Sequence, residues 1–329
     1  MCIRDSYHHV TREQRSQISA LKAIPTPHNK IAQIIGVSPS SVCRELKRNT
    51  GKRGYRYKQA DNMASDRRSR ISQITKKMTP EMVDLIEEKL ELDWSPEQIS
   101  GRLKLEERFI SHESIYRYIR KDKKNGGSLY KNLRRKGKKY NKRVSGKAGR
   151  GCIPNRVDIE NRPAVVEEKS RIGDWEGDTI IGAEHQGAVV SHVDRCSKYT
   201  ILAKVPNKTA ELVQQASVEQ FQFHGLPVLT ITYDNGKEFS NHEAIAKALN
   251  AQCFFAKPYH SWERGLNEHT NGLVRQYLPK KTSFKDVTNE QLQSIADKLN
   301  HRPRKCLNYL TPFEFLHREL SKPKTILDG

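Results

Sequence analysis

The order of strand-like and helix-like segments between residues 173 and 277 constrains the fold of this chain more than any other feature. Short apolar runs typical of strands alternate with segments in which apolar residues recur every three or four positions. Because the first three strands are joined by short connections and the later ones by crossover helices, we expect an antiparallel meander followed by parallel additions. This order predicts a mixed α/β sheet with helices on its faces. The predicted elements are strands at 173–182, 187–195 and 199–205, a helix at 209–223 with Leu212, Val213, Ala216 and Phe223 inward, a strand at 228–234, a helix at 241–250, a strand at 251–257 and a helix from about 261 to 277.

Three acidic residues fall at points that such a sheet could bring together. Asp178 lies inside the first strand, Asp234 ends the fourth strand in TYDNGKEF, and Glu268 lies on the helix after the fifth strand, with 33 residues between it and Asp234. The element order is similar to the ribonuclease H fold, which places the fourth strand beside the first. Taken alone, however, an Asp-Asn-Gly strand end is also explained by turn chemistry.

Periodicity does not choose among neighbouring acids. Asp174, Glu176 and Asp178 are two residues apart and share one strand face. Glu263 precedes Glu268 by five residues, which rotates it by roughly 140° around a helix, so the two cannot both point into one site.

Carboxylates with no cysteine or paired histidine nearby favour Mg²⁺ or Mn²⁺ over zinc, because hard divalent ions prefer oxygen ligands. The six cysteines are scattered without a Cys-x-x-Cys pair, which indicates neither a zinc site nor a disulfide framework.

Basic residues are concentrated in the first half of the chain. Residues 1–150 hold 36 of the 59 lysines and arginines but only 16 of the 38 acidic residues. A polyanion is the expected partner, and nucleic acid is the usual one because phosphate contacts release counterions. No apolar run approaches the roughly 18 residues of a membrane span, and no lipidation signal appears, so no membrane partner is expected. The opening MCIRDS has no signal-peptide pattern and reads as a loose tail. Without a signal peptide or a disulfide framework, a reducing cytoplasm is the expected location.

Residues 11–50 have the pattern of a helix-turn-helix. Thr11 and Gln14 have capping-box spacing, a short helix containing Ile31, Ile34 and Ile35 ends at Gly36, and Ser38-Pro39 starts the next helix. An ordinary helical hairpin would give a similar pattern, but the surrounding positive charge favours a DNA reader. The exposed side chains expected to contact DNA are Ser40, Ser41, Arg44, Lys47 and Arg48.

A similar arrangement recurs further along. Ser95 and Gln98 have capping-box spacing, and Ser111 starts a helix that would turn Arg117 and Arg120 outward toward DNA. The following segment, LYKNLRRKGKKYNKRVSGKAGRG, is rich in Lys, Arg and Gly and nearly free of apolar residues, which predicts a flexible tether along phosphates. Its expected DNA contacts are Arg134, Arg135, Lys138 and Lys139.

The motifs DWEGDTIIG, TYDNGKEF and WERGLNEHTNGLVRQYLPK, with their 33-residue gap, resemble the catalytic domain of DDE transposases and retroviral integrases. Within these, the chain is similar to bacterial transposases of insertion-sequence family thirty (IS thirty) over nearly its whole length, including the closing LNHRPRKCLNYLTPFEF. The resemblance implies that Asp178, Asp234 and Glu268 are a catalytic triad holding two Mg²⁺ ions, with Mn²⁺ as a substitute. It leaves Asp194 with a structural role.

The implied activity is metal-dependent cleavage and strand transfer of double-stranded DNA by a transposase that binds its element's terminal inverted repeats. A dimer or larger assembly on DNA is implied because two ends must meet. Asn271 and Arg275 share the helical face of Glu268 and are expected to meet the DNA backbone, although Arg275 could instead pair with an acid. The alternatives are a DNA-binding regulator with a non-catalytic α/β domain and a ribonuclease H-like nuclease without strand transfer.

These observations predict an α/β ribonuclease H-like (integrase-type) core preceded by all-α helix-turn-helix modules. The expected divisions are a helix-turn-helix domain at 1–50, a basic linker at 51–77, a second helical module at 78–128, a basic tether at 129–165, the catalytic core at 166–283 and a C-terminal helical extension at 284–329.

Overall fold

The computed structural model describes residues 9–74, 77–134, 153–257 and 261–322. The chain divides into two compact units, Met1–Thr79 and Pro80–Gly329, each of which is described by itself. No helix among the described residues is long and apolar enough to cross a membrane.

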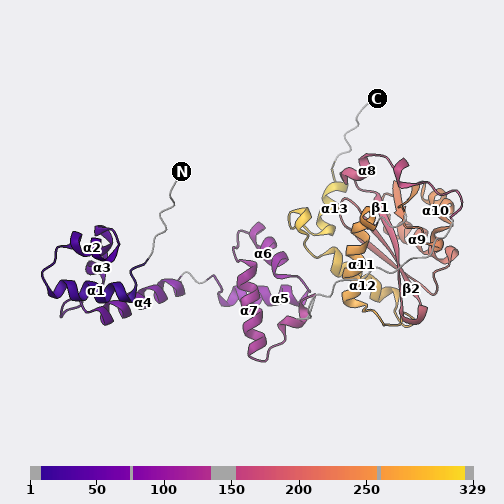
Figure 1. Cartoon of the computed structure of the whole chain (residues 1–329). Coiled ribbons are helices and arrows are strands. Elements are labelled where there is room, and N and C mark those ends of the chain that lie inside the picture. The colour runs from indigo at the N-terminus through magenta and orange to yellow at the C-terminus, as the bar shows by residue number, and fades with distance from the viewer. Residues whose placement is uncertain (1–8, 75–76, 135–152, 258–260, 323–329) are drawn as a thin grey trace. The chain divides into compact units, whose positions relative to one another are not determined.

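The first unit is helical, and its first three helices form the predicted helix-turn-helix (Figure 1). The capping box of Thr11 and Gln14 is present, and Ser38 caps α3 with Pro39 in its first turn. Gly36 ends α2 at a φ of 69°, a left-handed conformation that favours glycine. The helices are α1 (Arg12–Ala23), α2 (His28–Ile35), α3 (Pro39–Asn49) and α4 (Tyr57–Ile74).

A small apolar core and one buried ion pair hold these helices together. Ile18, Ile31 and Val42 are fully buried, whereas Ile34, expected in the apolar stripe, is 53% exposed. Arg15 Nε donates to Glu45 Oε1 at 2.8 Å inside this core, and the Arg15 guanidinium also pairs with another acid on α4.

The prediction of a basic linker over 51–77 is wrong for most of its length, because α4 occupies residues 57–74 and packs on the helix-turn-helix. Asp61 pairs with Arg15 at 3.0 Å, and Arg67 donates to the Asn49 side chain at 2.7 Å. Ala60 and Ala64 are buried. Alanines leave a weak hydrophobic pattern, and this is why periodicity missed the helix.

The second unit begins with the predicted helical module. Ser95 forms the expected capping box with Gln98, and Ser111 caps the following helix. The elements are α5 (Pro80–Glu91), α6 (Pro96–Leu105), α7 (His112–Lys124) and the 3-10 turn η1 (Leu129–Asn132). Their buried side chains include Ile86, Leu90, Ile99, Leu103, Ile115 and Ile119.

This module is bonded to the C-terminal segment of the same unit. Arg102 on α6 makes a two-pronged ion pair with Glu314, with N–O distances of 2.8 and 2.7 Å. A Cβ atom placed on Gly101 would lie 2.2 Å from the ring of Tyr309, so only glycine allows this approach.

A five-stranded sheet forms the centre of the second unit. Its strand order is β3-β2-β1-β4-β5, with β1–β2 and β2–β3 antiparallel and β1–β4 and β4–β5 parallel. This is the meander followed by parallel additions that the sequence predicts for a ribonuclease H-like core. The strands are β1 (Asp174–Ile181), β2 (Ala188–Asp194), β3 (Thr200–Val205), β4 (Thr230–Tyr233) and β5 (Gln252–Phe255).

Helices cover both faces of the sheet (Figure 1). One apolar cluster joins the sheet to α9 and α10, and the other joins it to α11 and α12. On α9 the prediction for Phe223 is wrong: that side chain is 79% exposed, and Phe221 is buried instead. The helices are α8 (Val165–Glu168), α9 (Ala210–His224), α10 (His242–Leu249), α11 (Gly265–Tyr277), α12 (Asn289–Asn300) and α13 (Pro312–Leu320), with 3-10 turns η2 (Ile159–Asn161), η3 (Ala183–His185), η4 (Lys237–Phe239), η5 (Ser261–Arg264) and η6 (Lys305–Leu307).

Helix α12 runs beside β3, the outer strand on one side of the sheet. The Asn300 side chain accepts from Thr200 N at 2.8 Å and donates to Thr200 O at 2.9 Å. At the other end, Asn289 Oδ1 accepts from Lys204 N at 3.1 Å. Both ends of β3 are therefore bonded to asparagines at the two ends of one helix.

The end of the expected tether belongs to the core. Residues 135–152 lie outside the described residues, but Ile153 is buried in the core, and Asp158 forms a parallel bridge with Phe255 of β5. The core therefore begins about 13 residues before the boundary expected at 166.

Candidate active site

Asp178 on β1 and Asp234 at the end of β4 both form ion pairs with the side chain of Arg264. The parallel pairing of β1 and β4 places Asp178 beside the end of β4, where Asp234 follows. Arg264 Nη2 lies 2.9 Å from Asp178 Oδ2, and Arg264 Nη1 lies 3.1 Å from Asp234 Oδ2. The Arg264 side chain is only 9% exposed. Its guanidinium therefore sits between two carboxylates that are 56 positions apart in the sequence.

Three polar groups orient Asp178. The backbone N–H of Thr179 donates to Oδ1 at 2.8 Å, and Asn271 Nδ2 donates to Oδ2 at 2.8 Å. Ser191 on β2 in turn donates to Asn271 Oδ1 at 3.0 Å. One asparagine of α11 thus contacts both β1 and β2.

The Asp-Asn-Gly turn holds Asp234 at the edge of the sheet. Gly236 N–H donates to Asp234 Oδ1 at 2.9 Å, and Asn235 Nδ2 donates to Ala256 O at 2.7 Å. Turn chemistry and a placed carboxylate are therefore both present, since the Asp side chain closes its own turn.

Burial raises the pKa of Asp178 to about 6. The positive charge of Arg264 opposes this rise, whereas the nearby carboxylates of Asp234 and Glu238 add to it. Glu238 accepts from Thr179 Oγ1 at 2.8 Å and lies 3.6 Å from Lys208 Nζ. This fourth acid was not among the expected site residues, although it stands in the same TYDNGKEF segment.

Glu268 is exposed on α11. It lies four residues after Arg264 and three before Asn271, so these residues share the helical face that contacts the aspartates. Among the described residues, no three His, Cys, Asp or Glu side chains are grouped closely enough to hold a metal ion. The structure thus brings two of the three expected acids together at Arg264 and leaves Glu268 exposed on the same side of α11.

The other acids of β1 have structural partners. Asp174 pairs with Arg171 at 2.8 Å and accepts from Thr230 Oγ1 at 2.8 Å. Glu176 is 2% exposed, pairs with Arg195 at 2.9 Å and accepts from the backbone N–H of Asn267. These bonds leave Asp178 as the acid of β1 that faces Asp234.

Asp194 has the expected structural role. Its carboxylate accepts from Gly173 N at 3.0 Å and from both N and Oγ of Ser197, at 2.6 and 2.7 Å. It closes the turn after β2 and does not reach the aspartate pair through any of these bonds.

The donor set of the site fits a hard divalent cation. The carboxylate oxygens of Asp178 and Asp234 both contact the positively charged Arg264, and Glu268 could add another oxygen. Oxygen donors of this kind suit Mg²⁺ and Mn²⁺.

On α3, the side chains expected to contact DNA lie at the surface. Ser40, Arg44, Lys47 and Arg48 are exposed, and Ser41 is half-buried. Arg44 Nε donates to the backbone of Ser40 at 3.1 Å, which lays its guanidinium along the first turn of the helix.

The expected contacts on α7 and beyond are placed only in part. Arg117 and Arg120 are exposed and lie 3.6 and 3.2 Å from Glu113. Arg134 Nη2 lies beside α11, 2.8 Å from where a Cβ on Gly272 would stand. Arg135, Lys138 and Lys139 lie outside the described residues.

Asn271 and Arg275, which are expected to meet the DNA backbone, have partners within the protein. Asn271 is bonded to Asp178 and Ser191, and Arg275 Nη2 donates to Ile181 O at 2.7 Å. The Arg275 guanidinium also lies 5.4 Å over the Phe284 ring, and burial lowers its pKa. Helical periodicity placed both residues on the face of Glu268, and their side chains bond to groups of β1 and β2, whereas Glu268 itself is exposed.

Comparison with known proteins gives matches along most of the chain. Residues 169–261 match the integrase core domain family, and residues 6–49 match a helix-turn-helix domain family. The transposase for insertion sequence element IS4351 of Bacteroides fragilis is 48% identical over 93% of this chain and 94% of that protein. The transposase for IS1086 of Cupriavidus metallidurans is 35% identical over 97% of each chain. Transposase InsI for IS30A of Escherichia coli is 34% identical over 94% of this chain and 84% of that protein.

Proposed function

Because this chain belongs to the family of insertion-sequence transposases that includes those of IS4351 and IS30A, we propose that it cuts and joins the ends of its own element with Asp178, Asp234 and Glu268. The enzyme is a DDE transposase, a polynucleotidyl transferase with an integrase-type core and a helix-turn-helix region that binds DNA. The observation that carries the residue assignment is the meeting of Asp178 and Asp234 at one buried guanidinium.

An integrase-type core depends on divalent metal ions. We assign two Mg²⁺ ions to the three carboxylates, with Mn²⁺ as a substitute. When bound, such ions supply electrostatic stabilisation of an in-line displacement at phosphorus.

The chain's own groups orient the carboxylates for this chemistry. Asn271 and Thr179 N–H fix the direction of Asp178, and Gly236 N–H fixes that of Asp234. Without a counter-charge, the clustered acids would repel each other and the DNA, and Arg264 supplies one.

Two displacements at phosphorus make up the proposed reaction. In the first, a water oxygen bonds to phosphorus at the element end, the P–O bond to the 3′ oxygen breaks, and a 3′-hydroxyl is released. In the second, that hydroxyl attacks a target phosphodiester and displaces the target's 3′ oxygen. The helix-turn-helix binds the terminal inverted repeats, and the protein acts at the bacterial nucleoid as a dimer or larger assembly because two ends must meet.

Asp234→Asn in the full chain tests the proposal. The variant should bind inverted-repeat duplexes as tightly as the wild type in fluorescence anisotropy, yet release no 3′ ends on a sequencing gel in Mg²⁺. Asp297→Asn, at an exposed position on α12, is the matched control and should cut normally. Undiminished cutting by Asp234→Asn would refute the residue assignment.

A second assay separates transposition from simple nuclease activity. A duplex supplied with a pre-cut 3′ end should be joined to target DNA by the wild type. Cutting without joined product would identify a nuclease, and repeat binding with neither activity would identify a regulator.

A further inference from the structure

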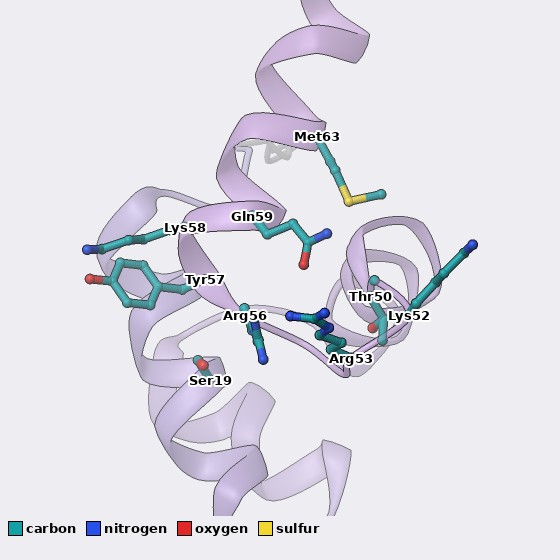
Figure 2. A pocket seen from close by; sticks show the side chains of 10 residues that line it. Ser19, Thr50, Lys52, Arg53, Arg56, Tyr57, Lys58, Gln59 and Met63 are labelled. Atoms are coloured by element: carbon teal, nitrogen blue, oxygen red, sulfur yellow. The ribbon is translucent and has the colours of Figure 1, made fainter.

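A basic pocket lies in the first unit, just beyond the helix-turn-helix. It is an open hollow of about 1040 Å³ between the turn that follows α3 and the start of α4 (Figure 2). Lys52, Arg53, Arg56 and Lys58 line it, together with Tyr57 and Gln59, and no acidic residue does. The matched helix-turn-helix segment ends at residue 49, so all of the pocket's lysines and arginines lie beyond it, whereas Ser19 of α1 lines the pocket from within it.

The turn that carries the charges has a defined shape. Gly51 and Gly54 pair as an antiparallel bridge, with N–O distances of 3.3 and 3.1 Å. Lys52 and Arg53 are the two residues at its tip, and Gly54 has a φ of 90°, which favours glycine. A Cβ on Gly51 would lie 2.6 Å from the Gln59 side chain, so the turn is seated closely on α4.

The pocket is built on a fixed frame. Tyr55, directly after the turn, donates from its hydroxyl to Glu45 of α3 at 3.0 Å. Arg15 of α1 binds both Glu45 and Asp61 of α4. The turn is therefore anchored at the end of α3 and at the start of α4 by bonds to buried groups.

The pocket's cations are available to a ligand. All four are exposed. Within the described part of the chain, none of them has an ion pair with an acid. Four positively charged side chains that line one hollow without a carboxylate leave an excess of charge that an anion would neutralise.

The pocket also continues the surface of α3. A smaller hollow of about 140 Å³ is lined by Ser41, Arg44 and Arg48 of α3 and by Arg67 of α4. Gln59 and Met63 line the larger pocket, and these residues and Arg67 are spaced four apart on α4. One face of α4 thus runs from the exposed side of α3 to the basic turn.

We infer that this pocket is a second DNA contact, which grips phosphates of the duplex next to the groove that α3 enters. The inference rests on the proposed function, because it needs α3 to face DNA. An open, cation-lined hollow suits a backbone segment, which carries one charge per phosphate and no sequence information. The turn then positions the protein on the duplex, and α3 reads bases.

The test is the salt dependence of DNA binding by the full chain carrying Lys52→Ala and Arg53→Ala. Fluorescence anisotropy is measured with an inverted-repeat duplex and an unrelated duplex of equal length. Loss of two phosphate contacts should lower the slope of log K against log salt by about 1.8 and weaken binding roughly tenfold per contact at 0.1 M salt. The loss should be equal on both duplexes. A double variant that preserves both charges, Lys52→Arg with Arg53→Lys, should keep the wild-type slope.

Arg12→Ala with Lys22→Ala is the matched control, since it removes two exposed charges from α1 outside the pocket. This control should keep the wild-type slope. Equal losses in the two double variants would overturn the inference, because net charge would then account for the effect. An unchanged slope in the pocket variant would also overturn the inference. This holds even if the wild-type pocket binds inorganic phosphate. A wild-type chain that binds no duplex contradicts the proposed function as well, whereas normal wild-type binding with an unaffected pocket variant contradicts the pocket alone.

Discussion

Asp178→Asn should make the metal-free protein more stable at neutral pH. The pKa of Asp178 is raised from 3.8 to about 6, mainly by burial. At 1.36 kcal/mol per pKa unit, the ionised carboxylate costs the folded state about 3 kcal/mol. The variant loses the hydrogen bond that Asn271 donates to Asp178, which lowers this gain in stability by about 1 kcal/mol. A net gain of about 2 kcal/mol remains.

The sign of the pH dependence follows from the raised pKa. Below about pH 4 the carboxyl group is protonated in the folded and unfolded states alike, so its charge costs nothing. The cost grows as the pH rises from 4 to 6 and is fully present above that range. The variant's advantage should therefore be present at pH 7.5 and absent at pH 4.

Urea unfolding in EDTA, followed by tryptophan fluorescence, measures this difference. All three tryptophans lie within residues 80–329, and Trp175 is buried on the same strand as Asp178. Asp297→Asn is the control and should stay within about 0.5 kcal/mol of the wild type. The reasoning would be refuted if the variant were less stable than the wild type at pH 7.5. It would also be refuted if the difference in free energy of unfolding were the same at pH 4 and pH 7.5.

Three further substitutions test other contacts. Arg264→Gln should lower the metal-free free energy of unfolding by about 1–3 kcal/mol, because Asp178 loses a buried partner, and added Mg²⁺ should stabilise this variant more than the wild type in the same urea assay. Glu45→Gln should cost the first unit about 3–5 kcal/mol by leaving Arg15 without its buried acid, seen as an earlier loss of helical circular dichroism on heating; an unchanged melting curve would contradict it. Gly101→Val should lower the melting temperature of the second unit, since its Cβ meets the Tyr309 ring, and Tyr309→Ala in the same chain should recover part of the loss if the clash is the cause.

The sheet was predictable from sequence because each strand carries its own local pattern. The short gaps around β2 and the long crossover before β4 determine which strands pair, so the proximity of Asp178 and Asp234 follows from chain order. Helix caps were equally readable, since Thr11, Ser38 and Ser95 cap through residues three positions away.

Contacts between distant segments left no comparable signal. Arg264 meets both aspartates only in the folded chain, and nothing in its spacing distinguishes it from a surface arginine. Arg275 matched the face of Glu268 by helical period, yet its partner is a backbone carbonyl at the end of β1. On α9, Phe221 and Phe223 differ by two positions, and the packing of the sheet, which the pattern does not contain, selects the first.

The asparagines at the two ends of α12 also restrict how copies of the protein can associate. An outer strand with free backbone groups is a template on which a second molecule can add a strand. In β3 the groups of Thr200 and Lys204 are already bonded to Asn300 and Asn289, and beyond β5 the backbone of Val157 accepts from Phe255 N at 2.9 Å. Both margins of the sheet are thus closed to strand addition at these positions. The assembly on DNA that we propose would then form through helices and loops. A copy truncated before Asn289 would leave the backbone groups of β3 unpaired and prone to aggregation.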